Sequence, residues 1–234
     1  MRIFECRVRR LRLAATLTAL GAVAGCLSST ESPRSDPPVL RLVNASPESF
    51  VTVHLDSLTE PLTTLSSNTA APGCFLVLPE EHVVSFILNG ETLDEFVTTL
   101  RRDSEYVVVL TKIADTFHAF AVPNDQNVPP GTIGLTLINA TATPGDVYVT
   151  GASEEPTAAT RVGTDLAPAV STAVPPYVTM TSSKLRVRLF DVGTTTNPRA
   201  DISLDPLLDG RSLAIVFTQG AFPASGAIPI QPCD

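Results

Sequence analysis

The feature of this sequence that most constrains its fold is a segment that occurs twice. Residues 40–46 align with residues 135–141, and each copy is followed by a proline and then by an alternating apolar run. Farther along, residues 106–111 align with residues 213–218, at a larger offset because the second copy has longer loops. Self-similarity of this kind is typical of a duplicated structural unit.

Each copy consists of short β-branched and aromatic runs separated by Gly, Pro, Asn and Asp, which is the spacing of a β-sandwich. No stretch after residue 38 has a helical period. The sequence therefore predicts an all-β fold with two tandem immunoglobulin-like β-sandwich domains, over residues 39–127 and 128–234, with a small barrel as the alternative. Strands are expected at residues 39–45, 50–55, 74–78, 82–88, 93–99, 105–111 and 116–122, and at residues 133–139, 146–150, 176–181, 184–190, 200–204, 212–218 and 227–230.

Two local patterns add to this prediction. Residues 123–131 are rich in Pro, Asn and Gly and are expected to be a turn-rich linker between the copies. In residues 185–189 aliphatic residues alternate with Arg186 and Arg188, and successive side chains of a strand point to opposite faces. Both arginines are therefore expected to point to solvent.

The first 25 residues have the three parts of a secretory signal. Five arginines precede an uncharged, mostly apolar stretch at residues 13–25, which is shorter than the roughly 20 residues of a membrane-spanning helix. The run Val23-Ala24-Gly25-Cys26 resembles the lipobox of bacterial lipoproteins. That resemblance implies cleavage before Cys26 and lipidation of its thiol and amine, with an ordinary signal peptide as the alternative. Leu27 replaces the Asp that would favour the inner membrane, which favours an outer-membrane protein facing the periplasm or the cell surface.

Residues 26–38 are polar and rich in Ser and Pro, so they do not bury enough apolar surface to fold. They are predicted to be a flexible tether that holds the first domain roughly 20 Å from the membrane. Contact with the bilayer is then expected to run through the N-terminal lipid.

Two cysteines remain once Cys6 is removed with the signal and Cys26 is acylated. An exported compartment permits disulfides, and the remaining pair has neither a zinc-site spacing nor a Cys-x-x-Cys redox motif. A disulfide between Cys74 and Cys233 is therefore expected to tie the C-terminal tail to the first copy. The alternative is two unpaired thiols that lie too far apart.

The charge of the chain argues against nucleic acid as a partner. Removal of the signal leaves 11 basic and 23 acidic residues, a net charge of −12. Such a surface repels phosphate backbones and anionic lipid headgroups. An envelope protein or a polysaccharide is the expected partner.

Residues 41–47 and 146–151 look like the two halves of the opening motif of the bacterial domain-of-unknown-function family 4397. In that family an Arg-Val-Val-Asn/His-Ala-Ser-Pro run precedes an Asp-Val-Tyr-Val-x-Gly strand, often in tandem copies on exported or lipid-anchored proteins. In the second copy Thr136 replaces the arginine, and in the first copy residues 52–56 match the second half loosely. The resemblance covers residues 39 to about 230. It implies a fold and no assigned activity.

Residues that often carry chemistry are few and scattered here. The three histidines, His54, His82 and His118, lie in expected strands or at their edges and are interpreted as structural. Residues 151–155 lack the last glycine of the Gly-x-Ser-x-Gly elbow. The acidic residues have neither a calcium-loop spacing nor the opposed placement of a hydrolase pair, and are interpreted as solvated turn residues; they are Glu80, Glu81, Asp125, Glu154, Glu155, Asp201, Asp205 and Asp209. No catalytic residue, metal site or cofactor is predicted.

Asn44 and Asn139 each begin an Asn-x-Ser/Thr sequence, which also fits an N-glycosylation acceptor. Their equivalent positions favour another role, in which the Asn and Ser/Thr side chains bond the backbone where the first strand ends in a turn.

These observations favour a lipid-anchored cell-envelope protein with a non-catalytic binding or structural role. A carbohydrate-binding module is a second hypothesis, although a chain with no Trp and three Tyr offers few stacking surfaces. An unrecognised hydrolase is the third.

Overall fold

The computed structural model describes residues 36–56, 58–124, 128–171, 177–179, 184–204, 210–219 and 225–233. In these ranges the chain is all-β, with one short 3-10 helix, η1 (Ala158–Thr160), and no helix long and apolar enough to cross a membrane. The predicted signal, the predicted lipidation of Cys26 and the tether up to residue 35 lie outside the described residues.

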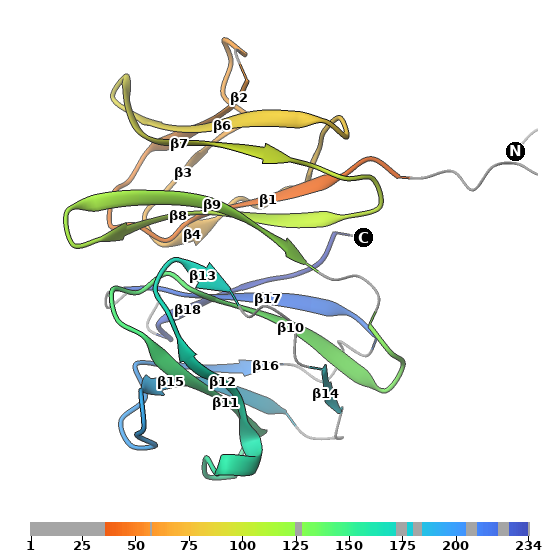
Figure 1. Ribbon diagram of the computed structural model, residues 1–234, viewed down its shortest axis with the longest axis vertical. Helices are drawn as coiled ribbons and strands as arrows, with labels where there is room; N and C mark the ends of the chain where they lie inside the picture. Colours follow the sequence, from red (N-terminus) through yellow and green to blue (C-terminus); the bar gives the residue numbers. More distant parts are fainter. Residues whose placement is uncertain are drawn as a thin grey trace, which may run out of the picture. The chain divides into compact units, whose positions relative to one another are not determined.

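The N-terminal half, residues 36–124, forms two facing sheets, β4-β1-β8-β9 with β5 beside β1, and β3-β2-β6-β7 (Figure 1). Most of its strands alternate inward apolar and outward polar residues. Its strands are β1 (Val39–Asn44), β2 (Val51–Leu55), β3 (Thr63–Leu65), β4 (Thr69–Ala70), β5 (Phe75–Leu76), β6 (Glu81–Leu88), β7 (Glu91–Thr99), β8 (Glu105–Ile113) and β9 (Thr116–Asn124).

The C-terminal half, residues 128–233, repeats this strand order. Its sheets are β13-β10-β17-β18 with β14 beside β10, and β12-β11-β15-β16. The parallel pair at the centre has the same register in both halves: Leu42 lies opposite Val108, and Leu137 lies opposite Ile215. Its strands are β10 (Thr132–Asn139), β11 (Gly145–Gly151), β12 (Arg161–Leu166), β13 (Val170–Ser171), β14 (Tyr177–Thr179), β15 (Leu185–Asp191), β16 (Ala200–Leu204), β17 (Ser212–Phe217) and β18 (Ala227–Ile230).

The likeness to the immunoglobulin fold lies in the two-layer architecture. In this chain β1 and β2 belong to different sheets, and β1 pairs in parallel with β8. The first two strands of a constant-type immunoglobulin domain share one sheet. The strand order of this sandwich therefore differs from that of a constant-type immunoglobulin domain.

Each half has its own hydrophobic core between its two sheets. In the N-terminal half Leu42, Val53, Phe86 and Val108 are completely buried there. Leu137, Val147, Val187, Ile215 and Phe217 form the corresponding core of the C-terminal half.

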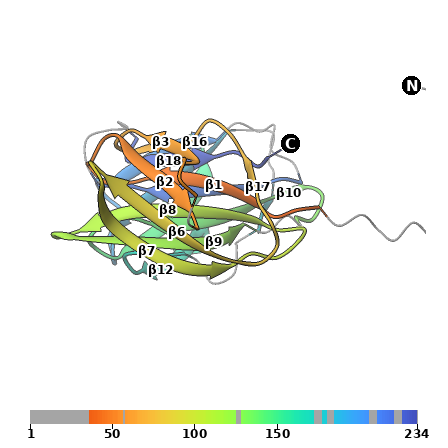
Figure 2. The same ribbon diagram turned by 90° about the horizontal axis from the view of Figure 1, so that it is seen from above.

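A third core joins the halves, because the outer face of the β1-β8-β9 sheet packs on the outer face of the β10-β17-β18 sheet. Val107 and Val109 of β8 meet Ile138 and Val216, and all four side chains are completely buried. The four sheets thus form a stack, which Figure 2 views with β2, β6 and β7 nearest the reader. The described residues from 36 onward group into one compact unit.

The expected linker and tether are shorter than predicted. Strand β9 continues through Pro123 and Asn124, and Asn124 is buried, so the connection to β10 starts later than residue 123. At the other end Pro38 is buried, and Asp36 exchanges hydrogen bonds with Asp103. Backbone pairing that the loop-like composition did not indicate fixes both segments.

The prediction that Arg188 points to solvent is wrong. Its side chain is 5% exposed and donates from Nη2 to the Thr150 hydroxyl and the Glu154 carbonyl, each at 2.6 Å. Arg186 lies at the half-buried edge and pairs with Asp201. The 151–155 turn folds over this face of the sheet and supplies the Glu154 carbonyl to the guanidinium of Arg188.

The strand prediction missed β3, β4, β12 and β13. Three of them have only two or three residues, too few for an alternating pattern. The fourth, β12, contains Gly163 and Asp165 and pairs with β11 through a register shift. Bulged strands of this kind lose the period on which a sequence pattern depends.

The turn role predicted for Asn44 is confirmed. Its Oδ1 accepts the Ser46 N–H at 3.0 Å and the Ser46 hydroxyl at 2.7 Å. Its Nδ2 donates to the carbonyls of Glu48 at 2.7 Å and Ser66 at 3.1 Å. One buried amide therefore holds the end of β1 against two loops.

Asn139 makes the same four bonds in the C-terminal half. Its Oδ1 accepts the N–H and hydroxyl of Thr141 at 2.9 and 2.7 Å, and its Nδ2 donates to the carbonyls of Thr143 at 3.0 Å and Leu166 at 2.7 Å. Both asparagines are completely buried.

Replacing Asn44 with alanine is expected to lower the free energy of unfolding by about 3 kcal/mol, because buried backbone groups lose their partners at about 1 kcal/mol or more each. Asn139→Ala should cost a similar amount. Urea unfolding of both variants measures this. Asn44→Asp should cost more, because a carboxylate would face two carbonyls. A loss below about 1 kcal/mol for Asn44→Ala would contradict the assigned role.

Candidate functional site

An apolar groove of about 510 Å³ lies on the N-terminal half, where β2, β5 and β6 meet the segment that enters β1. Its volume is that of a site for a ligand or a short peptide segment. It is lined by Pro37, Leu55, Asp56, Leu58, Leu62, Leu76, Val77, Leu78, Glu80 and His82.

Three leucines make the rim of this groove strongly apolar. The exposed fractions are 54% for Leu58, 69% for Leu76 and 66% for Leu78. Alternation in the extended segment after Cys74 explains this, since Phe75 and Val77 pack on the core and the two leucines face the other way. Exposed leucines gathered in one groove indicate a contact surface for another molecule.

His82 and Asp56 fix the floor of the groove. His82 is 3% exposed, with its Nδ1 at 2.8 Å from Asp56 Oδ2 and its Nε2 at 2.8 Å from the Leu78 carbonyl. Because both ring nitrogens face oxygens that only accept, the geometry favours the imidazolium form. Asp56 Oδ1 also accepts the Val83 N–H at 2.9 Å. The pair joins β2, β6 and the leucine segment.

The pKa values of this pair follow from that geometry. Burial disfavours the charged form of His82, but the Leu78 carbonyl and the Asp56 carboxylate outweigh burial and raise its pKa above 6.5. Burial likewise opposes the charge of Asp56, and the hydrogen bonds from His82 and Val83 outweigh it and lower its pKa below 3.8. The ion pair is therefore the stable form near pH 6.

Stability should fall as the pH rises past this range. A raised folded pKa means that the contribution of His82 is complete below pH 6.5 and is lost as the pH rises through the folded value. The contribution of Asp56 is complete above pH 3.8 and is lost as the pH falls through its lowered value. Thermal unfolding from pH 5 to pH 9 should show the alkaline loss in the wild type and in His54→Gln. It should be reduced in His82→Gln, and an unchanged profile there would contradict the assignment.

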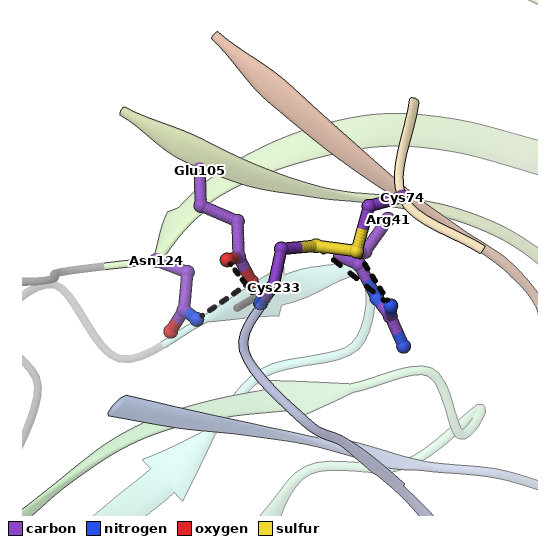
Figure 3. The surroundings of a disulfide bond; sticks show 5 residues. All are labelled: Arg41, Cys74, Glu105, Asn124 and Cys233. Atoms are coloured by element: carbon purple, nitrogen blue, oxygen red, sulfur yellow. Dashed lines mark hydrogen bonds between the residues drawn. A yellow bond between two sulfur atoms is a disulfide. The ribbon is translucent and has the colours of Figure 1, made fainter. Parts of the chain in front are cut away.

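The disulfide between Cys74 and Cys233 is present, as predicted, with its Cα atoms 6.2 Å apart (Figure 3). Cys74 precedes β5 and Cys233 follows β18, so the bond joins the two halves. Arg41 lies beside it, with Nη1 at 3.0 Å from Cys74 Sγ and 3.8 Å from Cys233 Sγ.

A buried polar network supports the same junction. Glu105 is 4% exposed and accepts the Cys233 N–H at 3.1 Å and the Asn124 amide at 3.2 Å. The Asn124 oxygen in turn accepts the hydroxyls of Thr136 at 2.9 Å and Ser212 at 2.7 Å. Hydrogen bonds across both halves therefore accompany the disulfide.

The remaining candidate residues lie apart from one another. His54 contacts the Leu58 carbonyl, His118 lies in β9, and Glu154 accepts the Gly151 N–H within its turn. Glu80 and Glu81 are exposed, Glu155 is an exposed turn residue, and Asp201 pairs with Arg186. Asp125, Asp205 and Asp209 lie outside the described residues. Across the described ranges, no three His, Cys, Asp or Glu side chains are grouped to hold a metal ion.

Sequence reasoning did not identify the groove or the place of Arg41. The available signal for the groove was the spacing of Leu76 and Leu78, two residues apart on one face of the strand expected at residues 74–78. Arg41 had no local signal, because its neighbours Cys74 and Cys233 are distant in the sequence.

Searches against protein-family models and against curated proteins found no match to this chain. The resemblance to family 4397 therefore stays a prediction that rests on residues 41–47 and 146–151.

Proposed function

We propose that this protein is exported, anchored to the cell envelope by lipid on Cys26, and acts there as a non-catalytic binding module. The observation that carries the binding role is the groove with Leu58, Leu76 and Leu78 on its rim. The disulfide supports an exported location, since such bonds persist in oxidising compartments.

The charge of the groove selects the partner. Asp56 and Glu80 contribute two carboxylates to its lining and His82 one cation, within a mature chain of net charge −12. An anionic ligand is therefore disfavoured. The occupant that fits is an apolar segment of an envelope protein that carries basic residues beside its aliphatic ones, because it matches both the leucines and the carboxylates.

Binding is tested with a short peptide of alternating leucine and lysine, and with the same peptide carrying glutamate for lysine. Fluorescence anisotropy should show tighter binding of the lysine peptide. Replacing Leu76 and Leu78 with serine should reduce its affinity at least about tenfold, because a few buried aliphatic anchors dominate such contacts. The matched control replaces Val170 and Val192, two exposed apolar residues of the C-terminal half, with serine. Equal binding of both peptides, or no effect of the leucine changes, would refute the groove as the site.

The anchor is tested separately. Mass spectrometry of the envelope protein should identify a lipidated peptide that begins at Cys26, and Cys26→Ser should abolish membrane retention. A mature protein that begins at another residue would overturn the lipidation and leave the peptide result unaffected.

A further inference from the structure

The two sulfurs of the disulfide have different surroundings. Cys74 is solvent-exposed and lies against Arg41. Cys233 is half-buried and is one of the residues that line a separate pocket of about 270 Å³. The rest of this pocket is formed by Asp36, Pro37, Val39, Asp103, Ser104 and Glu105.

Arg41 lies closer to Cys74 Sγ than to Cys233 Sγ. Its guanidinium lies 3.0 Å from Cys74 Sγ and 3.8 Å from Cys233 Sγ. Among the described residues no carboxylate lies within ion-pair distance of Arg41. Its charge is therefore available to a thiolate that forms on Cys74, and a cation at this distance stabilises a thiolate.

We propose that the Cys74–Cys233 bond is a thiol–disulfide exchange site that accepts electrons from a cationic thiol. In the cell this donor is a protein dithiol with a basic surface. The attacking thiolate enters the pocket and forms a bond to Cys233 Sγ, while the disulfide bond breaks and its electron pair leaves with Cys74 Sγ. The second thiolate of the dithiol then attacks its own mixed disulfide and releases Cys233 as a thiolate. The dithiol is oxidised by two electrons, the cystine is reduced, and the new thiolates take protons from water.

The acidic residues of the pocket set the selectivity of this site. Asp36, Asp103 and Glu105 all line the approach to Cys233. A thiol that carries a positive charge gains from these carboxylates, and an anionic thiol is repelled.

Reduction then opens a clasp between the halves. Strand β18 stays paired with β17, so the released part of the tail is the short segment from residue 231 to Cys233. This segment keeps the Cys233 N–H bond to Glu105 and the contact of Arg41 with Cys233 Sγ.

The test compares the exchange rates of the exported protein with cysteamine, which is cationic, and 3-mercaptopropionate, which is anionic. Each rate per thiolate is divided by the rate of the same thiol with an uncharged small disulfide, because thiolates of lower pKa are intrinsically weaker nucleophiles. Cysteamine should react several-fold faster. The ratio of the two rates should decrease in Asp103→Asn, which removes one pocket carboxylate. It should also decrease at high salt, because salt near 1 M shortens the screening length to about 3 Å. Arg41→Gln should slow exchange by roughly 3- to 10-fold, since a higher leaving-group pKa slows the reaction, and Arg41→Lys should retain most of the rate.

The position of the first adduct decides the proposal on the wild-type protein alone. After brief reaction and alkylation, mass spectrometry should find cysteamine on Cys233 and the alkyl group on Cys74. The opposite assignment, or equal rates for the two thiols after division by their rates with the uncharged disulfide, would overturn the proposal. Circular dichroism of oxidised Arg41→Gln, compared with the oxidised wild type, verifies that a slower rate does not come from a changed fold.

Discussion

Replacing both Cys74 and Cys233 with alanine is expected to lower the free energy of unfolding by about 3 to 5 kcal/mol. The bond joins residues 159 positions apart, so it restricts the unfolded chain strongly. The loop-entropy relation gives about 5 kcal/mol for a loop of this length, and other effects usually reduce the observed value. Guanidinium unfolding of the oxidised wild type and the double variant measures the difference.

The reduced wild-type protein is the control for this experiment. Dithiothreitol should lower the stability of the wild type to nearly that of the double variant and leave the variant unchanged. A double variant as stable as the oxidised protein would show that the unfolded chain gains little freedom without the bond.

Replacing Val109 with aspartate is expected to cost about 4 kcal/mol or more, because it buries an unpaired carboxylate where the two halves meet. Val109 is completely buried against the outer face of the β10-β17-β18 sheet. Nearby, the Thr111 hydroxyl donates to the Ala140 carbonyl at 2.7 Å across the same junction. Val109→Ala should cost about 2 kcal/mol, from lost burial and a small cavity.

Val97→Asp is the matched control, since Val97 is 59% exposed on β7. It should change stability by less than about 0.5 kcal/mol, as surface substitutions usually do. Thermal unfolding measures all three variants. If Val109→Asp were as stable as Val97→Asp, the outer faces of the two sheets would not be packed in solution.

Both predictions concern the junction between the N-terminal and C-terminal halves. The disulfide links the halves at one side of this junction, and Val107 and Val109 pack in its core. The disulfide stabilises the protein mainly by lowering the conformational entropy of the unfolded chain. The valine contacts stabilise it by burying apolar surface in the folded state. Reduction should therefore lower stability while the valine contacts persist.

Several features of this protein are determined by its sequence alone. The alternating runs placed most strands within one or two residues, because a strand with one buried face must repeat every second residue. The equivalent Asn44 and Asn139 indicated the turn bonds, since Asx side chains reach backbone groups two residues away. The pairing of Cys74 with Cys233 was predicted by counting the cysteines that would remain after the predicted removal of Cys6 and acylation of Cys26.

Other features were decided only by the tertiary structure. The continuous apolar runs of β8 and β17 are compatible with burial on both faces, but a periodic pattern does not say which surface covers the second face. Arg188 is buried because a turn from residues 151–155 folds over it, and Arg41 meets the disulfide because two distant segments converge there. Contacts between residues far apart in the chain depend on how whole sheets pack. Local periodicity determines where the strands lie, but it does not determine how one sheet packs on another.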